Sequence, residues 1–126
     1  MIRQLVLCAL MIATGSVSAV AQQPAMPACI GKENIVRVSD IKPGMMPKFE
    51  EAVAAQAAWY KKAGTSDEIK LLHVMDMKTH DWSTTEPLTE HLVTGKSPAH
   101  DAGFDAFVAL FSQSSTIKAQ YITCQK

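Results

Sequence analysis

The chain has 126 residues, enough for one domain of ordinary size, and its twelve Lys and Arg residues balance twelve Asp and Glu residues. With zero net charge and no basic patch, the sequence excludes a nucleic-acid-binding surface of the usual electrostatic kind. The sequence also contains no cationic amphipathic segment of the kind that forms a helix on a membrane surface.

Residues 1–21 have the features of a secretory signal peptide. Arg3 supplies a positive start, an uncharged apolar run continues to Ala13, and a small-x-small sequence ends at Ala21, where we expect cleavage (or after Ala19). The apolar run is shorter than the roughly 20 residues of a membrane-spanning helix, and no later segment is long and apolar enough to form one. A buried N-terminal helix is the alternative. We expect a mature protein without a membrane anchor, periplasmic or secreted.

Two cysteines remain after cleavage, Cys29 and Cys124, near the two ends of the mature chain. In an oxidising compartment such a pair most often forms one disulfide, and two separate buried thiols are the alternative. Residues 22–32 are polar and contain prolines, which indicates a flexible lead-in. The predicted folded domain is therefore 33–126.

The first part of this domain predicts a strand followed by a helix. A β-branched run favours a strand over 33–41. In 46–63, apolar and aromatic residues recur at steps of three and four, which is typical of one face of a helix. Pro47 falls in the first turn, where its missing N–H does no harm, and Gly64 stands just past the end.

Two further strands are predicted in the middle of the chain. Residues 68–77 alternate between two faces, one of them largely apolar. A polar stretch around Trp82 predicts a turn or loop, and a weaker strand follows over 88–94.

The last third predicts a helix and a final strand. Ser97 is a candidate N-cap, Pro98 a candidate first helical residue, and spaced phenylalanines continue the helix to about Ser114. Residues 117–124 predict the last strand.

The order strand, helix, strand, strand, helix, strand predicts an α+β, ferredoxin-like domain: one four-stranded antiparallel sheet with two helices on one face. In this fold the start of the first strand lies beside the end of the fourth. Cys29 precedes the first and Cys124 ends the fourth, so element order and cysteine position both favour the disulfide.

Three sequences in 35–64 carry a family likeness: the strand IVRV, the turn KPG at 42–44 and the helix end YKKAG at 60–64. They resemble the dimeric α/β-barrel superfamily, which includes antibiotic-biosynthesis-monooxygenase-like domains. The likeness extends over 33–124 as a pattern of elements. It implies a homodimer in which two sheets face each other. Members include cofactor-free oxygenases, haem-degrading enzymes and proteins without known chemistry, so the fold does not choose a function.

The dimer is also expected from the residues. Helices can cover one face of such a sheet, yet Leu72 and Val74 alternate with Leu71 and Met75 along one predicted strand. The second apolar face needs a cover, and a second copy is the commonest one.

Five residues are candidates for a ligand cavity between helices and sheet: Arg37, Trp59, Tyr60, His73 and His91. A hairpin turning near Trp82 would place His73 and His91 roughly opposite each other. The alternative is that Trp59 and Tyr60 belong to the core and that Arg37 pairs with a carboxylate.

Two imidazoles on adjacent strands could also bind a metal, with His80, Asp81 or His100 as a third ligand. No metal-binding motif supports such a site, so we expect neither metal nor cofactor.

The haem-degrading relatives carry an Asn, a Trp and a His in chain order, which Asn34, Trp82 and His91 or His100 could match. Three common residues in order form a motif of low specificity.

The leading hypothesis is an exported homodimer that binds a small apolar or aromatic molecule without metal. The alternatives are a cofactor-independent monooxygenase and a structural dimer with a filled barrel.

Overall fold

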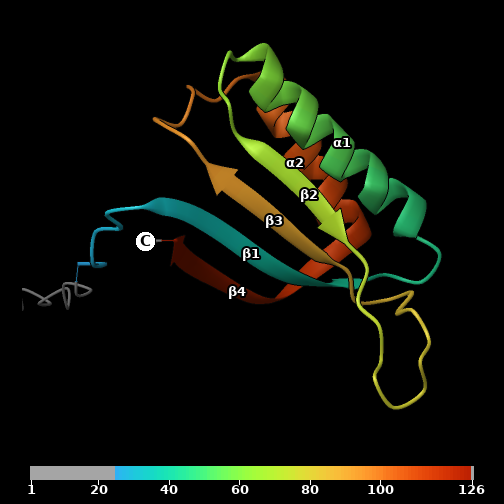
Figure 1. The fold of residues 1–126 in the computed structure, drawn as a ribbon. Coiled ribbons are helices and arrows are strands. Elements are labelled where there is room, and N and C mark those ends of the chain that lie inside the picture. The colour runs from blue at the N-terminus through green and yellow to red at the C-terminus, as the bar shows by residue number, and fades with distance from the viewer. Residues whose placement is uncertain (1–24, 126) are drawn as a thin grey trace, which may run out of the picture.

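The computed structural model describes residues 25–125, so the expected signal peptide lies outside the described residues. Six elements follow in the expected order: β1 (Lys32–Ile41), α1 (Met46–Lys62), β2 (Glu68–Leu72), β3 (Leu88–Val93), α2 (Ala102–Ser114) and β4 (Ser115–Gln125) (Figure 1).

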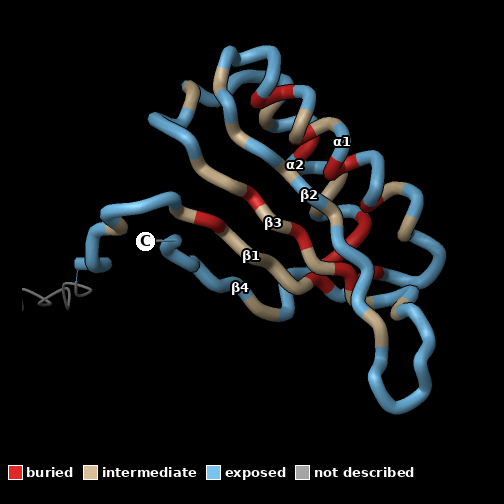
Figure 2. Tube along the Cα trace, in the orientation of Figure 1, coloured by how far each residue is buried: buried red, intermediate tan, exposed pale blue. Residues whose placement is uncertain are grey.

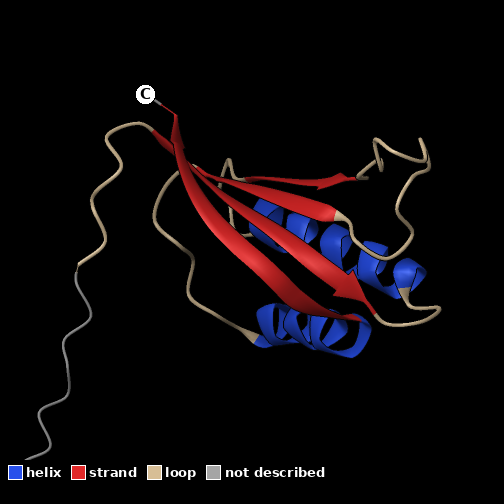
Figure 3. Ribbon diagram, turned by 90° about the horizontal axis from the view of Figure 1, so that it is seen from below, coloured by secondary structure: helices blue, strands red, loops and turns tan. Residues whose placement is uncertain are grey.

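The four strands form one sheet in the order β2-β3-β1-β4, and every neighbouring pair is antiparallel. Both helices lie on the same face of this sheet, while the other face has no helix over it (Figure 3). This arrangement is that of a ferredoxin-like fold, and the prediction of an α+β domain with two helices on one face is confirmed.

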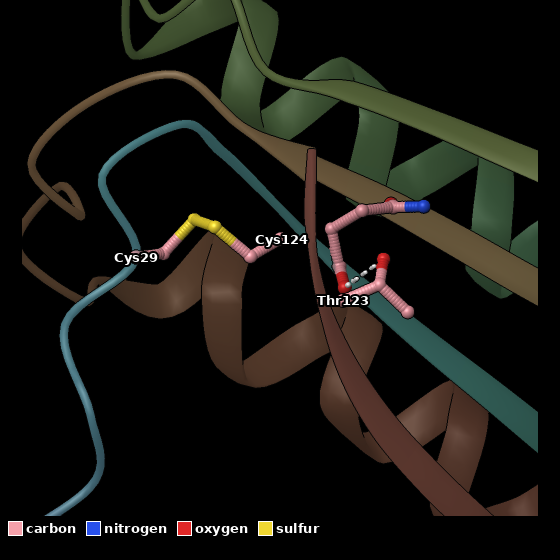
Figure 4. Close-up of a disulfide and its surroundings, with 4 residues drawn as sticks. Cys29, Thr123 and Cys124 are labelled. Atoms are coloured by element: carbon pink, nitrogen blue, oxygen red, sulfur yellow. Dashed lines mark hydrogen bonds between the residues drawn. A yellow bond between two sulfur atoms is a disulfide. The ribbon is translucent and has the colours of Figure 1, made fainter. Parts of the chain in front are cut away.

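A disulfide joins Cys29 to Cys124, whose Cα atoms are 5.6 Å apart (Figure 4). The register explains the pairing, because Glu33 at the start of β1 lies opposite Cys124 near the end of β4. The bond closes a loop of 95 residues and ties the lead-in to the edge strand of the sheet. The cysteine pair expected from the sequence is therefore present.

The core lies between the helices and the sheet. Phe49 of α1 is fully buried and makes an edge-to-face contact with Phe111 of α2, with ring centroids 5.4 Å apart. Ile69 and Leu71 of β2 pack against this cluster from the sheet. Buried positions accordingly follow the inner sides of the helices, the middle of β3 and the two ends of β1, whose middle is partly exposed (Figure 2).

The ends of α1 agree with the sequence. Pro47 lies in the first turn. Gly64 follows the helix with a φ of 79°, in the left-handed region that favours glycine, and its N–H donates to the carbonyl of Lys61.

The prediction that the second strand reaches residue 77 is wrong. Strand β2 ends at Leu72, which pairs with Leu88, the first residue of β3, and the carbonyl of the preceding Pro87 faces β1, where it accepts from the backbone N–H of Ser39 at 3.2 Å. Beyond this point only an isolated bridge between Met75 and Trp82 joins the two arms. Residues 73–87 form a loop that extends away from the sheet (Figure 1).

The predicted start of the second helix is also wrong. Helix α2 begins at Ala102, and its N-cap is Asp101, whose Oδ1 accepts from the backbone N–H of Phe104 at 3.0 Å. The same oxygen accepts from the indole N–H of Trp59 at 2.7 Å. Asp101, a preferred N-cap residue, therefore caps the helix in place of Ser97 and also joins it to α1.

The final strand is longer than predicted, since β4 continues directly from α2 at Ser115 and runs to Gln125. Between residues 25 and 125, no helix has both the length and the apolar character that a membrane crossing requires.

Candidate functional site

An unusual row of polar side chains crosses the sheet face that the helices cover. The register aligns Leu71 of β2, Thr89 of β3, Arg37 of β1 and Gln120 of β4. Directly opposed residues of antiparallel strands share a face, and Leu71 packs on the helices, so the whole row faces them. Thr89 is buried, Arg37 is partly exposed and Gln120 is exposed, and three polar residues side by side on the helix-facing side of the sheet mark the row as a candidate site.

A cavity of about 450 Å³ opens between this row and α2. Its floor is formed by sheet residues and its roof by Val108, Phe111 and Ser112 of α2. The complete lining is Arg37, Ser39, Thr89, Val108, Phe111, Ser112, Ser115, Thr116 and Ile117. The volume falls in the usual range for small-molecule sites.

Arg37 is the charged residue of the lining. Its Nε donates to Oε1 of Gln120 at 2.6 Å, across the pair β1–β4. Within residues 25–125 no carboxylate forms an ion pair with it, so the expected alternative, pairing with a carboxylate, is wrong. The guanidinium keeps its remaining N–H donors for another partner.

Trp59 and Tyr60 belong to the core, as the alternative interpretation expected. Each is 7% exposed, and both lie in a cluster with Phe107, outside the cavity lining. The indole of Trp59 makes edge-to-face contacts with Phe104 and Phe107 of α2. These two residues join α1 to α2 and support the site without lining it.

His91 lies under α1 in a buried hydrogen-bonded pair. Its Nε2 is 2.7 Å from Oδ2 of Asp67, and the two side chains are 10% and 6% exposed. The other oxygen, Oδ1, accepts from the hydroxyl of Thr94 at 2.7 Å and from its backbone N–H at 3.1 Å. The ring of Tyr60 packs on the imidazole of His91, with the two ring centroids 4.7 Å apart. The cluster attaches the α1–β2 connection to the end of β3.

Burial raises the pKa of the Tyr60 hydroxyl, and the charge of Asp67 raises it further, while Arg37 opposes the shift. A tyrosine with a raised pKa stays neutral near pH 7, so this group is not a general base.

The expected apposition of His73 and His91 is wrong. His91 pairs with Ile69 of β2 and Ile35 of β1, whereas His73 follows the last paired residue of β2 and is exposed. The site therefore contains Arg37 alone of the five candidates. Tyr60 and His91 lie together beside it, and His73 lies apart.

The Asn-Trp-His order expected from haem-degrading relatives does not form a site. Asn34 is opposite Leu92, one residue from His91, so the two side chains lie on opposite faces of the sheet. Trp82 lies in the exposed 73–87 loop. Among residues 25–125, no cluster of three or more His, Cys, Asp or Glu residues could hold a metal ion.

Sequence reasoning missed Asp67 and the hydroxyls of Ser39 and Thr89. Alternation in 33–41 and 88–94 could have placed these two hydroxyls on the face of Arg37 and His91. No local pattern indicates that Asp67 reaches His91, 24 residues away.

A substitution at Gly103, near the start of α2, would test how tightly the two helices pack against each other. A Cβ there would lie 3.0 Å from Cδ1 of Trp59 and 3.2 Å from Oδ1 of Asp101. An exposed helical Gly→Ala change stabilises by roughly 0.5–1 kcal/mol, but overpacking costs about 1–3 kcal/mol. Because Trp59 is held by its bond to Asp101, we expect Gly103→Ala to lower the free energy of unfolding by about 1 kcal/mol.

Urea denaturation measures this change, with Gly95→Ala as the control because no heavy atom lies within 4 Å of its added Cβ. A more stable Gly103→Ala protein would show that Trp59 can move aside.

No protein-family model and no curated protein matches the chain. Among solved structures, it is similar to a crystal structure of At3g17210 from Arabidopsis thaliana, with 16% identity and a TM-score of 0.46. The similarity covers 75% of this chain and 93% of that chain. A score below 0.5 carries no conclusion, so the fold assignment rests on the element order and the strand register.

Proposed function

We propose that the protein binds a small apolar or aromatic molecule in the cavity between the sheet and α2. The observation that carries this proposal is a 450 Å³ cavity that combines apolar walls with a small number of polar groups on a rigid sheet. Phe111, Val108 and Ile117 supply the apolar surface, and Val108 and Ile117 are 43% and 60% exposed.

Binding without catalysis is the better supported form of this proposal. A cofactor-independent oxygenase needs a base beside its substrate, and the cavity lining includes neither His73 nor His91. Tyr60, with its raised pKa, is not a substitute base.

Native mass spectrometry of protein purified from its own compartment tests the proposal. We expect a bound small molecule, which Val108→Trp should displace because the indole fills the space under α2. Ala54→Trp, on the exposed side of α1, is the matched control and should retain the ligand. Retention of the ligand by both variants contradicts the proposal. So does a protein that carries no ligand when purified and binds no added small-molecule probe.

The same proposal includes a homodimer closed through the helix-free face of the sheet. The register places one apolar row and one mixed row there. The apolar row contains Leu72, Leu88, Val38 and Ala119, and the mixed row contains Val36 and Tyr121 beside Lys70 and Glu90. Leu72 is 41% and Tyr121 58% exposed, and a second copy of the face would cover them. The bulk of these side chains also supports the structural-dimer alternative, in which the barrel interior is filled.

Sedimentation equilibrium tests the dimer. We expect Val38→Glu to weaken dimerisation by at least about tenfold, since a carboxylate would be buried unpaired in the interface. Ala58→Glu, on the exposed side of α1, is the control for the added charge and should leave the dimer intact. A monomeric wild-type protein would contradict the dimer while leaving the ligand site standing.

Export to an oxidising compartment completes the proposal. The disulfide between Cys29 and Cys124 supports it, because such bonds persist in the periplasm and outside the cell.

A further inference from the structure

We infer that the molecule bound in the cavity is an organic anion, an apolar body carrying one carboxylate or a similar acidic group, with the anion placed against Arg37. This inference rests on the proposed ligand site and specifies its ligand class.

Arg37 is partly exposed, and no carboxylate within residues 25–125 forms an ion pair with it. Gln120 occupies only Nε, so the other N–H groups can form the paired hydrogen bonds that a carboxylate accepts. The missing counter-ion is what the ligand would provide.

Two hydroxyls lie beside this cation on the cavity floor. Ser39 and Thr89 both line the cavity, and Thr89 is the direct cross-strand neighbour of Arg37. Ser39 and Thr89 are 4% and 9% exposed, and their hydroxyls form no hydrogen bond within residues 25–125. Each can donate to an anionic oxygen.

The charge on the cavity lining itself is positive, although Asp40 lies opposite the lining residue Thr116 on the neighbouring strand. The lining contains Arg37 and no acidic residue. A second cation lies next to it, because Nζ of Lys42 donates to the backbone carbonyl of Ser112, a lining residue, at 2.8 Å. A positive field over an apolar wall favours an amphipathic acid over a neutral or cationic molecule.

Calorimetric titration with two probes of one shape tests the inference. 1-Naphthoate is ionised at neutral pH, and 1-naphthalenemethanol is its uncharged counterpart. We expect the wild-type protein to bind naphthoate at least about tenfold more tightly than the alcohol, because a charge-assisted pair is about twice as strong as a neutral hydrogen bond. Arg37→Gln should abolish this preference and leave the affinity for the alcohol within about twofold.

Arg37→Lys keeps the charge and should retain part of the preference, which keeps the test decisive if the Gln variant fails to fold. Lys61→Gln removes one positive charge at the exposed end of α1 and should change neither affinity. Equal binding of both probes, unchanged in Arg37→Gln, overturns the anion inference while the cavity stands as a ligand site. If neither probe binds and Val108→Trp retains the native ligand, the proposed site itself is overturned.

Discussion

Replacing both Cys29 and Cys124 with serine is expected to lower the free energy of unfolding by about 2–5 kcal/mol, a large share of the roughly 5–15 kcal/mol of a typical domain. The bond spans 95 residues and therefore restricts the unfolded chain strongly, since loop-closure entropy grows with loop length. It also anchors the lead-in at the outer edge of the sheet, where β4 has a single neighbour, β1.

Urea denaturation followed by circular dichroism measures this loss. In reducing agent, the wild-type protein should unfold at the same urea concentration as the double variant. Reducing agent should leave the urea midpoint of the double variant unchanged. An unchanged midpoint in both would mean that the sheet holds β4 without the bond.

Asp67→Ala is expected to lower the free energy of unfolding by about 3 kcal/mol, because it leaves the buried His91 without its partner. The change also removes the acceptor for the hydroxyl and the backbone N–H of Thr94. Asp81→Ala, in the exposed 73–87 loop, is the control and should stay within about 0.5 kcal/mol of the wild type. A loss equal to that of the control would mean that water replaces the carboxylate.

The same carboxylate predicts a dependence of stability on pH. Burial alone would raise the pKa of Asp67, but hydrogen bonds from His91 and Thr94 outweigh burial and lower it below the ordinary value of 3.8. Above 3.8 the carboxylate is ionised in both folded and unfolded chains, and its stabilisation is complete. As pH falls below 3.8, the unfolded chain binds the proton first, so stability is lost until the lower folded-state pKa is passed.

Unfolding free energies measured on both sides of this window should therefore fall less steeply in Asp67→Asn than in the wild type. Parallel curves would assign the acid sensitivity to other carboxylates.

Most element boundaries that were predicted from local pattern agree with the structure. Alternation and helical spacing placed β1, α1, β3 and the end of α2 within about two residues, because each pattern reports which side of one element is buried. The errors arose where a distant residue decides the outcome. The pairing of β2 ends at Leu72 because its partner strand β3 begins only at Leu88, and Trp59, 42 residues away, contacts the acidic cap of α2.

The candidate site divides in the same way. Arg37 could be proposed from its place in an apolar strand, and Trp59 and Tyr60 could be weighed as core residues from their helical spacing. The hydrogen-bond partner of Arg37 could not be predicted, because Gln120 lies 83 residues further along the chain and is brought to Arg37 only by the register of β1 and β4. The same holds for Asp67 beneath His91.

Taken alone, the sequence determined the kinds of element, their order and the two cysteines that meet, since these follow from side-chain periodicity and from a topology with few alternatives. The tertiary structure decided which polar residues share a face and which of them border the cavity. A shift of one residue in strand pairing moves a side chain to the opposite face of the sheet, and only the pairing of distant segments sets that register. That is why Asn34 and His91 are separated by the sheet, while Arg37 and Thr89 lie side by side beneath α2.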